Sequence, residues 1–539
     1  MRIDPSLGLP SKYTEWRDDQ YRAVEATVRS DRPVFLLDAP TGIGKSLIGI
    51  GVHRILRASC VYVTRTKQLQ GQIMKDFAGL AVELKGKANY PCVLNQETYE
   101  KYPEITADDC RYGKPSQCPE YGDCPYHCMK EKAKRSPLVV LNDAYFLNEA
   151  NGLYSVFSGR QLLVVDEVDS IEAGLLNYIE FKITTRLIDQ YGLKMPEKPF
   201  LKQSWLDWIP GVLRSLAPAI EGADELLGGV PVGSWGTREL EVQRRKKSMA
   251  KLFDRLSFLQ SECDSSWIFY SQEVTNGYEY VFKPVNIGKY SGKYLWDHAT
   301  RALGMSGTIF SAEITCRDLG IHSADYMRVE SPFPIENRPI YFRPVCNLTH
   351  KTMEAELPKL RDDIDQIVQL YRNGKVLVHT ASYKIRDFLA ENLYCQSRIM
   401  THNSVDREAA LIEFKTTGGA SVMLSPSFDR GVDLPEEDNC QAVIVAKVPY
   451  LNLSDPQVKA KVDQPGGWEW YALKAAQTLV QETGRSIRSP TQKCDCWILD
   501  SQFSRLRSRM EGTIPDWWMK AVKDVRADVP VRDVFPRGK

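Results

Sequence analysis

Short runs of apolar residues recur along this chain, separated by longer amphipathic or polar stretches. A short apolar run bounded by turn-forming residues suits a strand that is covered on both faces, and the amphipathic stretch Leu47–Leu56 suits a helix. The alternation of such strands with helices predicts an α/β protein built on parallel sheets. The runs expected to form strands are Val34–Leu37, Val61–Val63, Leu138–Leu141, Leu162–Val165, Val376–His379, Val422–Leu424, Cys440–Val445 and Cys496–Leu499.

Two stretches interrupt this pattern and predict the domain organisation. The first is rich in Cys, Pro and Tyr. The second carries a long helical segment, Glu239–Glu262, and two strand-like segments that flank Asn276–Gly277 as in a hairpin. The expected divisions are 1–86, 137–171 and 301–330 for a first α/β domain, 87–136 and 172–300 for two insertions, and 331–539 for a second α/β domain.

The segment DAPTGIGKS at Asp38–Ser46 has the pattern of a phosphate-binding loop between a strand and a helix. Such a loop needs glycines that bring backbone N–H groups close to polyphosphate oxygens, and a lysine that reaches the β- and γ-phosphates. The first glycine of the general pattern is replaced here by Ala39. The flanking strand and helix favour an ATP site over an ordinary Gly-rich turn. The residues expected around the nucleotide are Ala39, Pro40, Thr41, Gly42, Ile43, Gly44, Lys45 and Ser46.

Asp166 and Glu167 follow the strand Leu162–Val165, at the edge where parallel sheets bind their ligands. We expect Asp166, with Ser46, to hold Mg²⁺, and Glu167 to polarise the attacking water. Acidic residues after a strand are usually solvated turn residues. The phosphate-binding loop upstream favours the catalytic interpretation.

Gln481, Arg485 and Arg488 lie in the segment QETGRSIRS. On a helix, Arg485 and Arg488 would lie one turn apart on one face, where two guanidinium groups can stabilise charge on a transferred phosphoryl group. A solvated basic face is the alternative, and the strands predicted on both sides of this helix disfavour it. Near the N-terminus, Arg17 and Gln20 can contact an adenine edge. Together these segments predict an ATP-driven motor with ATP bridging the two domains.

Five of the 13 cysteines fall between Cys92 and Cys128, with 17, 7, 5 and 3 residues in the successive gaps. A disulfide framework is not expected in a long chain without a secretory signal, so a metal centre is the leading interpretation. A 4Fe-4S cluster takes four thiolates. Zinc bound by Cys124, His127 or Cys128 is one alternative, and buried cysteines without a metal are the other.

The order of several motifs indicates a family. They are WRDDQ with Arg17 and Gln20, DAPTGIGKS, TRT at Thr64–Thr66, KGKANYPC at Lys85–Cys92, Asn142 in VLNDAYFL, DEVD at Asp166–Asp169, SGT at Ser306–Thr308, HTASY at His379–Tyr383, SFDRGVDLP with Gly431 and Asp433, QETGRSIRS, and the acidic pair Asp495 and Asp500. Along nearly its whole length the chain resembles the DinG/XPD family of superfamily 2 DNA helicases. The resemblance implies two RecA-like P-loop motor domains, an iron–sulfur insertion and a mainly helical, arch-like insertion.

The resemblance also implies site residues and an activity. Gly431 and Asp433 would join the nucleotide site, and Cys92, Cys110, Cys118 and Cys124 would hold the cluster, with Cys128 spare or in the place of Cys124. The implied activity is ATP-dependent 5′–3′ translocation and unwinding by a monomeric motor of a compact bacterial or phage type, on single-stranded and forked DNA. No residue chooses between DNA repair, replication, a phage function and a CRISPR-associated one.

Candidate nucleic-acid contacts are a set of hydroxyl, basic and aromatic side chains. They are Thr64, Arg65, Thr66, Tyr90, Tyr126, Thr380 and Ser382, of which the two tyrosines can equally pack the cysteine-rich insertion. The basic run Arg244–Lys247 is expected to be a solvated helix face. Two alternatives stay open: an ATPase that translocates on RNA or without unwinding, and a scaffold with a vestigial ATPase, which the intact catalytic residues disfavour.

Composition sets bounds on these expectations. The net charge of the 539 residues is only +1, so a DNA path would be a local groove rather than a uniformly basic surface. There is no run of ~20 apolar residues and no signal peptide at the polar N-terminus, so we expect a cytoplasmic enzyme without a membrane span.

Overall fold

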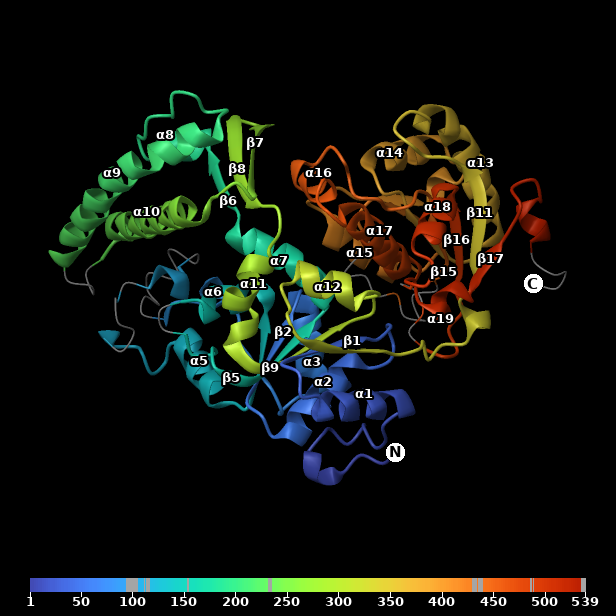
Figure 1. The fold of residues 1–539 in the computed structure, drawn as a ribbon, viewed down its shortest axis with the longest axis horizontal. Helices are drawn as coiled ribbons and strands as arrows, with labels where there is room; N and C mark the ends of the chain where they lie inside the picture. The colour runs from blue at the N-terminus through green and yellow to red at the C-terminus, as the bar shows by residue number, and fades with distance from the viewer. Residues whose placement is uncertain are drawn as a thin grey trace.

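The computed structural model describes residues 1–93, 105–110, 112, 117–152, 155–230, 235–428, 434, 440–484, 487 and 489–534. Figure 1 shows two α/β bodies, one blue to teal and one orange to red, and a green helical hairpin that projects from the first. We call the body around the first sheet domain 1 and the body around the second sheet domain 2. The predicted α/β class with two parallel-sheet domains is confirmed.

Domain 1 is built on a parallel sheet that has seven strands in the described residues, in the order β10-β1-β9-β5-β2-β4-β3. Its central strands are buried, which is why they appear in the sequence as nearly continuous apolar runs. The strands are Val34–Asp38 (β1), Cys60–Thr64 (β2), Val82–Glu83 (β3), Leu138–Asn142 (β4), Arg160–Asp166 (β5), Ala299–Ser306 (β9) and Ala324–Arg328 (β10). The helices are Asp18–Arg29 (α1), Lys45–Leu56 (α2), Lys67–Asp76 (α3), Asp143–Ala150 (α6), Ile171–Ile179 (α7), Gly288–Tyr294 (α11) and Ala312–Asp318 (α12).

Both predicted insertions leave domain 1 between strands of this sheet. The first carries Pro125–Arg135 (α5), whose Tyr126 and Ala133 are buried in the core of domain 1. The second carries an antiparallel sheet in the order β6-β8-β7 and the long helical hairpin of Figure 1. Its elements are Phe181–Thr184 (β6), Thr185–Gln190 (α8), Lys202–Gly228 (α9), Thr237–Glu262 (α10), Trp267–Val274 (β7) and Gly277–Pro284 (β8).

The basic run on α10 is largely exposed, as expected, since Arg244, Arg245 and Lys247 are all exposed, and three of its four side chains also make polar contacts. Arg244 Nε donates to Asp109 Oδ1 at 2.7 Å, and Lys247 Nζ donates to the Asp108 carbonyl. Lys246 pairs with Asp224 of α9. Two of these side chains therefore fasten the helical hairpin to the cysteine-rich insertion.

Domain 2 repeats the parallel architecture, and the described residues give its strand order as β13-β14-β12-β15-β16-β11-β17. The strands are Ile340–Cys346 (β11), Lys375–His379 (β12), Ile399–Thr401 (β13), Val422–Ser425 (β14), Cys440–Val445 (β15), Asp495–Asp500 (β16) and Val522–Asp524 (β17). The helices are Met353–Leu370 (α13), Tyr383–Asn392 (α14), Arg407–Thr416 (α15), Pro456–Val462 (α16), Gly467–Thr483 (α17), Gln502–Arg509 (α18) and Asp516–Met519 (α19). None of the helices in the described ranges combines the length and apolarity needed to cross a bilayer.

Candidate nucleotide site between the two domains

The loop between β1 and α2 has a backbone that only glycine adopts without strain. Gly42 and Gly44 have φ angles of 86° and 85°. A Cβ on Gly42 would lie 2.1 Å from Cζ of Phe333, and one on Gly44 would lie 2.6 Å from Nε2 of Gln20. The loop leads directly into the N-terminus of α2, which is a favourable position for anionic phosphate groups.

Lys45 lies where a phosphate-binding lysine is required. Its Nζ is 3.4 Å from the Ala39 carbonyl oxygen and 3.9 Å from Oε1 of Glu167. The ammonium group from the loop and the carboxylate from the end of β5 therefore share one side of the site. These are the two side chains that the sequence assigned to phosphate binding and to water activation.

Arg17 and Gln20 brace the loop in this structure. Gln20 Nε2 donates to the Ile43 carbonyl at 2.7 Å, and Arg17 Nη1 donates to the Gly42 carbonyl at 2.8 Å. Gln20 Oε1 in turn accepts the Arg17 N–H at 3.0 Å. The predicted contact with an adenine edge stays a prediction, and the bracing contacts place both side chains beside the phosphate-binding loop.

Tyr62, which sequence reasoning missed, connects the two expected Mg²⁺ ligands. Its hydroxyl donates to Asp166 Oδ2 at 3.1 Å and also hydrogen-bonds Ser46. Burial raises the pKa of Asp166 to about 6, the neighbouring Glu167 carboxylate adds to this effect, and Lys45 opposes it. One carboxylate and one hydroxyl suit Mg²⁺, which keeps several waters and takes further oxygens from phosphates. The donor set therefore fits the expected ion.

Gln481 joins the domains at this site. Its Nε2 lies 3.1 Å from Asp169 Oδ2 and 2.7 Å from Thr308 Oγ1. Asp169 also accepts hydrogen bonds from Ser306 Oγ at 2.6 Å and from Thr308 Oγ1 at 3.2 Å. The DEVD, SGT and Gln481 segments thus form one polar cluster. Asp169 was missed as a site residue, although its place at the end of DEVD was a usable signal.

The predicted arginines follow the end of α17 in the sequence. In the described residues α17 ends at Thr483, with Gly484 as its C-cap. Arg485 and Arg488 lie outside the described residues, as do Gly431 and Asp433. Their assigned roles stay predictions.

Asp38, at the end of β1, is a further residue that the sequence did not single out. Its carboxylate accepts hydrogen bonds from the N–H groups of Ile309 and Phe310, the Tyr326 hydroxyl and Arg328 Nε, at 2.9 to 3.2 Å. Burial raises the pKa of Asp38, and the Arg328 charge opposes this effect. Asp38 thereby ties the start of the phosphate-binding loop to the segment that follows SGT.

The four predicted cluster ligands lie in one region. Burial raises the pKa of the Cys118 thiol, and Cys110, Cys92 and Cys124 raise it further through their charges. The thiol of Cys128 donates to the Gly122 carbonyl at 2.9 Å. The thiols match a 4Fe-4S centre in kind and number. Across the described residues, however, no three His, Cys, Asp or Glu side chains are arranged to hold a metal ion.

Equivalent turns follow β2 in domain 1 and β12 in domain 2. Thr64 Oγ1 donates to the Thr66 carbonyl at 3.3 Å, and Thr380 Oγ1 donates to the Ser382 carbonyl at 3.1 Å. The hydroxyls of Thr66 and Ser382 then cap α3 and α14. The two domains thus present matching hydroxyl-bearing turns. Arg65 is paired with Asp143 at 2.5 Å.

The two candidate stacking tyrosines are mainly packing residues. Tyr126 is only 3% exposed, and its hydroxyl hydrogen-bonds that of Tyr145 at 3.0 Å. Tyr90 packs edge-on against Tyr126 and accepts the Lys85 N–H. A buried ring cannot offer a face to a base, so Tyr126 is not a stacking platform in this structure.

Comparisons with known proteins agree with this geometry. The family model described as the helicase C-terminal domain matches residues 364–521. The chain is 22% identical to the ATP-dependent DNA helicase YoaA of Haemophilus influenzae, covering 87% of this chain and 88% of the relative. It is 21% identical to the ATP-dependent DNA helicase XPD of Sulfolobus acidocaldarius, covering 95% and 98%.

Solved structures of XPD helicases share the fold. One superposes with a TM-score of 0.62 at 17% identity, covering 95% of this chain and all of that one. The S. tokodaii Xpd4 structure gives a TM-score of 0.58 at 15% identity, covering 94% and 100%. The resemblance predicted from the motifs is confirmed.

Proposed function

We propose that this chain, a DinG/XPD-like superfamily 2 helicase by its fold and its C-terminal domain, is an ATP-dependent DNA helicase. The observation that carries the proposal is the cluster of Gln481, Asp169 and Thr308, because it couples the domain that holds the phosphate-binding loop to the domain that must move relative to it. The matched relatives are named ATP-dependent DNA helicases, which supports DNA as the substrate.

ATP occupies the loop at Gly42–Ser46, where the α2 N-terminus and Lys45 meet its phosphates. Ser46 and Asp166 would hold Mg²⁺, which would supply positive charge against the negative charge that develops on the phosphates. Glu167 orients the attacking water, since its carboxylate is 3.9 Å from the Lys45 ammonium group. Arg485 and Arg488 supply the charge that stabilises the transferred phosphoryl group from domain 2.

The cysteine-rich insertion holds a 4Fe-4S cluster through Cys92, Cys110, Cys118 and Cys124. Two observations support this assignment: the mutual electrostatic effect on Cys118, and the separate contact of Cys128 with Gly122. Bound there, the cluster would cross-link the insertion. The side chains of Arg244 and Lys247 hold the helical hairpin against the same insertion.

The direction of movement is 5′ to 3′ on the strand that the motor holds, by analogy with the family it resembles. Single-stranded DNA lies across the turns at Thr64–Thr66 and Thr380–Ser382, which face it from the two domains. Domain closure around ATP and opening after hydrolysis move these turns relative to one another. The insertion, anchored at its ends to domain 1, separates the strands.

The test uses protein purified without oxygen and forks that carry only a 5′ tail or only a 3′ tail. ATP-dependent unwinding from the 5′ tail is expected. Unwinding from the 3′ tail alone would overturn the direction. Nucleic-acid-stimulated ATP hydrolysis without strand separation would favour a translocase, and stimulation by RNA alone would assign RNA as the substrate.

A further inference from the structure

Three polar side chains on one stripe of α17 reach across to domain 1. They are Lys474, Gln477 and Gln481, at positions i, i+3 and i+7, which share a helix face. Lys474 Nζ is 3.4 Å from the Asp169 carbonyl oxygen, and Gln477 Nε2 donates to the Thr308 carbonyl at 2.6 Å. The stripe therefore fixes how α17 is rotated against domain 1.

A buried charge cluster anchors the N-terminal part of this stripe. Glu172 of α7 accepts from Lys474 at 3.1 Å and from Lys461 of α16, and Lys461 is also 3.7 Å from Asp318 of α12. Burial acts to raise the pKa of Glu172, but the two ammonium groups outweigh it and lower the pKa to about 2. The carboxylate is therefore ionised at neutral pH, and both of its ammonium partners come from domain 2.

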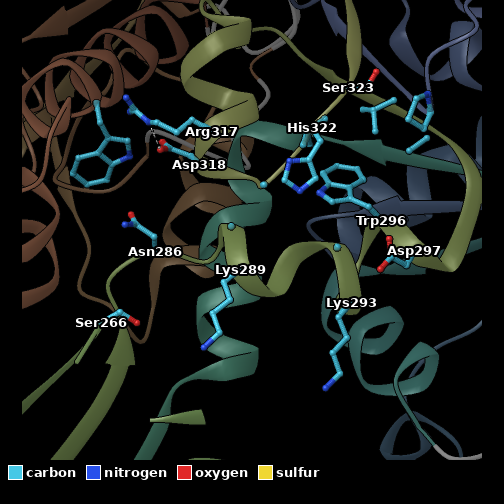
Figure 2. A pocket seen from close by; sticks show the side chains of 18 of the residues that line it. Ser266, Asn286, Lys289, Lys293, Trp296, Asp297, Arg317, Asp318, His322 and Ser323 are labelled. Carbon is cyan, nitrogen blue, oxygen red and sulfur yellow. Dashed lines mark hydrogen bonds and ion pairs between the residues drawn. The ribbon is translucent and has the colours of Figure 1, made fainter. Parts of the chain in front are cut away.

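The cluster lies against a cavity of about 980 Å³, which is lined by α11 and α12 of domain 1 and by Lys461 and Trp470 of domain 2. Figure 2 shows Arg317 and Asp318 together at the end that faces domain 2, whereas Lys289 and Lys293 project elsewhere. Apolar contact across the boundary is made beside the cavity by Ile314 of α12, which packs against Val462 of α16 and Trp470 of α17. The charged pairs add a directional contact to this packing.

We propose that Glu172 and Lys474 are positioning residues for ATP hydrolysis, which hold α17 so that Gln481 meets Asp169 and Thr308. Neither residue touches the phosphate-binding loop in this structure. Gln481 lies two helical turns beyond Lys474, about 10 Å along the axis. A small rotation about that anchor shifts the Gln481 amide, and misplacement by about 1 Å can cost a reaction ~100-fold. This inference rests on the proposed ATPase.

The experiment compares Lys474→Met, Glu172→Gln and the double variant with wild type. We expect kcat for DNA-stimulated ATP hydrolysis to fall by ~10- to 100-fold while KM for ATP changes less than about twofold, because the loop and Lys45 are untouched. The double variant should be no slower than the slower single variant, since both substitutions break one contact. Lys474→Arg, which keeps the charge, should restore most of the rate.

The matched control is Lys459→Met, which removes an exposed lysine of the adjacent helix α16 and should leave kcat unchanged. Glu172→Gln removes one of the two carboxylates that pair with the buried Lys461, which can destabilise the fold. If Glu172→Gln does not fold, Lys474→Met alone decides the test. Equal changes in kcat and KM, additive losses in the double variant, or no rescue by Lys474→Arg would each overturn the assignment.

Amide hydrogen exchange gives a readout that does not depend on activity. Peptides from the C-terminal part of α17 should exchange faster in Lys474→Met than in Lys459→Met, because the anchor is lost. If the wild-type protein lacks DNA-stimulated hydrolysis, the proposed function is wrong, and the exchange experiment can still test whether Lys474 anchors α17. Unchanged exchange in Lys474→Met would sink the inference on its own.

Discussion

Gln481 donates its side-chain amide to Asp169 across the domain boundary, with 3.1 Å between Nε2 and Oδ2. The same nitrogen contacts Thr308, which is itself bonded to Asp169. One amide of domain 2 therefore contacts both the segment that follows β5 and the segment that follows β9. Since Asp166 and Glu167 lie on the first of these segments, nucleotide contacts and domain contacts share a single backbone turn.

Replacing Gln481 should separate binding from turnover. Gln481→Ala removes the donor and should lower kcat by ~10-fold, and Gln481→Glu should lower it further, because a second carboxylate then faces Asp169. The measurement is steady-state ATP hydrolysis with single-stranded DNA. Gln502→Ala, which removes an amide contact to Asn347 on the surface of domain 2, serves as the control. A faster Gln481→Glu than Gln481→Ala would contradict this account.

Lys45 and Glu167 should fail in different ways. Lys45→Ala removes the ammonium group that meets the β- and γ-phosphates, so nucleotide binding should weaken. Glu167→Gln keeps the shape and removes the group that orients water, so binding should persist while turnover is lost. Equilibrium titration with a fluorescent nucleotide and a phosphate-release assay separate the two. Phosphate release at the wild-type rate by Glu167→Gln would reject its role.

The apolar runs predicted the strands well because buried parallel strands tolerate few polar residues. The strand predicted at Val34–Leu37 is Val34–Asp38 in the structure, and the strand predicted at Cys440–Val445 has those bounds. The phosphate-binding loop was also evident, since its glycines and lysine are dictated by local backbone geometry. These features depend on residues that are close together in the sequence.

Features that depend on distant residues were missed. Tyr62 is one apolar-looking position in a strand, and only the fold brings its hydroxyl to Ser46 and Asp166. The α10 basic run is exposed as predicted, but its contacts with Asp108 and Asp109 were not foreseen because these residues lie in another insertion.

Gly42 should not tolerate even one methyl group. Gly42→Ala forces an L residue to φ 86° and places Cβ 2.1 Å from the Phe333 ring, so nucleotide binding should be lost. Phe333→Ala in the same chain should recover only part of it, because the backbone strain of about 1–2 kcal/mol remains. Nucleotide titration is the measurement.

Gly71→Ala is the matched control for this substitution. Gly71 lies inside α3, and a Cβ added there would meet no other atom within 4 Å, so alanine should stabilise the helix by about 0.5–1 kcal/mol. Full nucleotide affinity in Gly42→Ala would show that the loop is not confined as the structure indicates.

Cysteine substitutions should distinguish the ligands from the spare thiol. Cys92→Ser, Cys110→Ser, Cys118→Ser and Cys124→Ser should each reduce the bound iron and acid-labile sulfide from about four of each per chain, whereas Cys128→Ser should retain both. The reason is that the Cys128 thiol is already engaged by the Gly122 carbonyl. Iron and sulfide analysis of anaerobically purified protein gives the result. Loss of iron in Cys128→Ser together with its retention in Cys124→Ser would exchange these two residues, and stoichiometric zinc without sulfide would replace the cluster with a zinc site.

The stability that Glu172 contributes should disappear in acid. Its pKa is lowered from 4.5 to about 2 in the folded protein, because the attraction of Lys461 and Lys474 outweighs burial. A group with a lowered folded pKa stabilises the protein above its unfolded pKa, and this stability is lost as the pH falls from about 4.5 through about 2. The shift corresponds to a contribution on the order of 3 kcal/mol at neutral pH.

Wild type should therefore exceed Glu172→Gln in free energy of unfolding at about pH 7 and 5, and the difference should shrink steadily at about pH 4 and 3. Urea unfolding at each pH measures it, with both proteins in the same buffer and salt. Glu354→Gln, which breaks the exposed pair with Lys384, is the control and should show little difference at any pH, because solvent screens that pair. A gap between wild type and Glu172→Gln that stays constant from pH 7 to about pH 3 would mean that the buried carboxylate does not hold the two domains together through its charge.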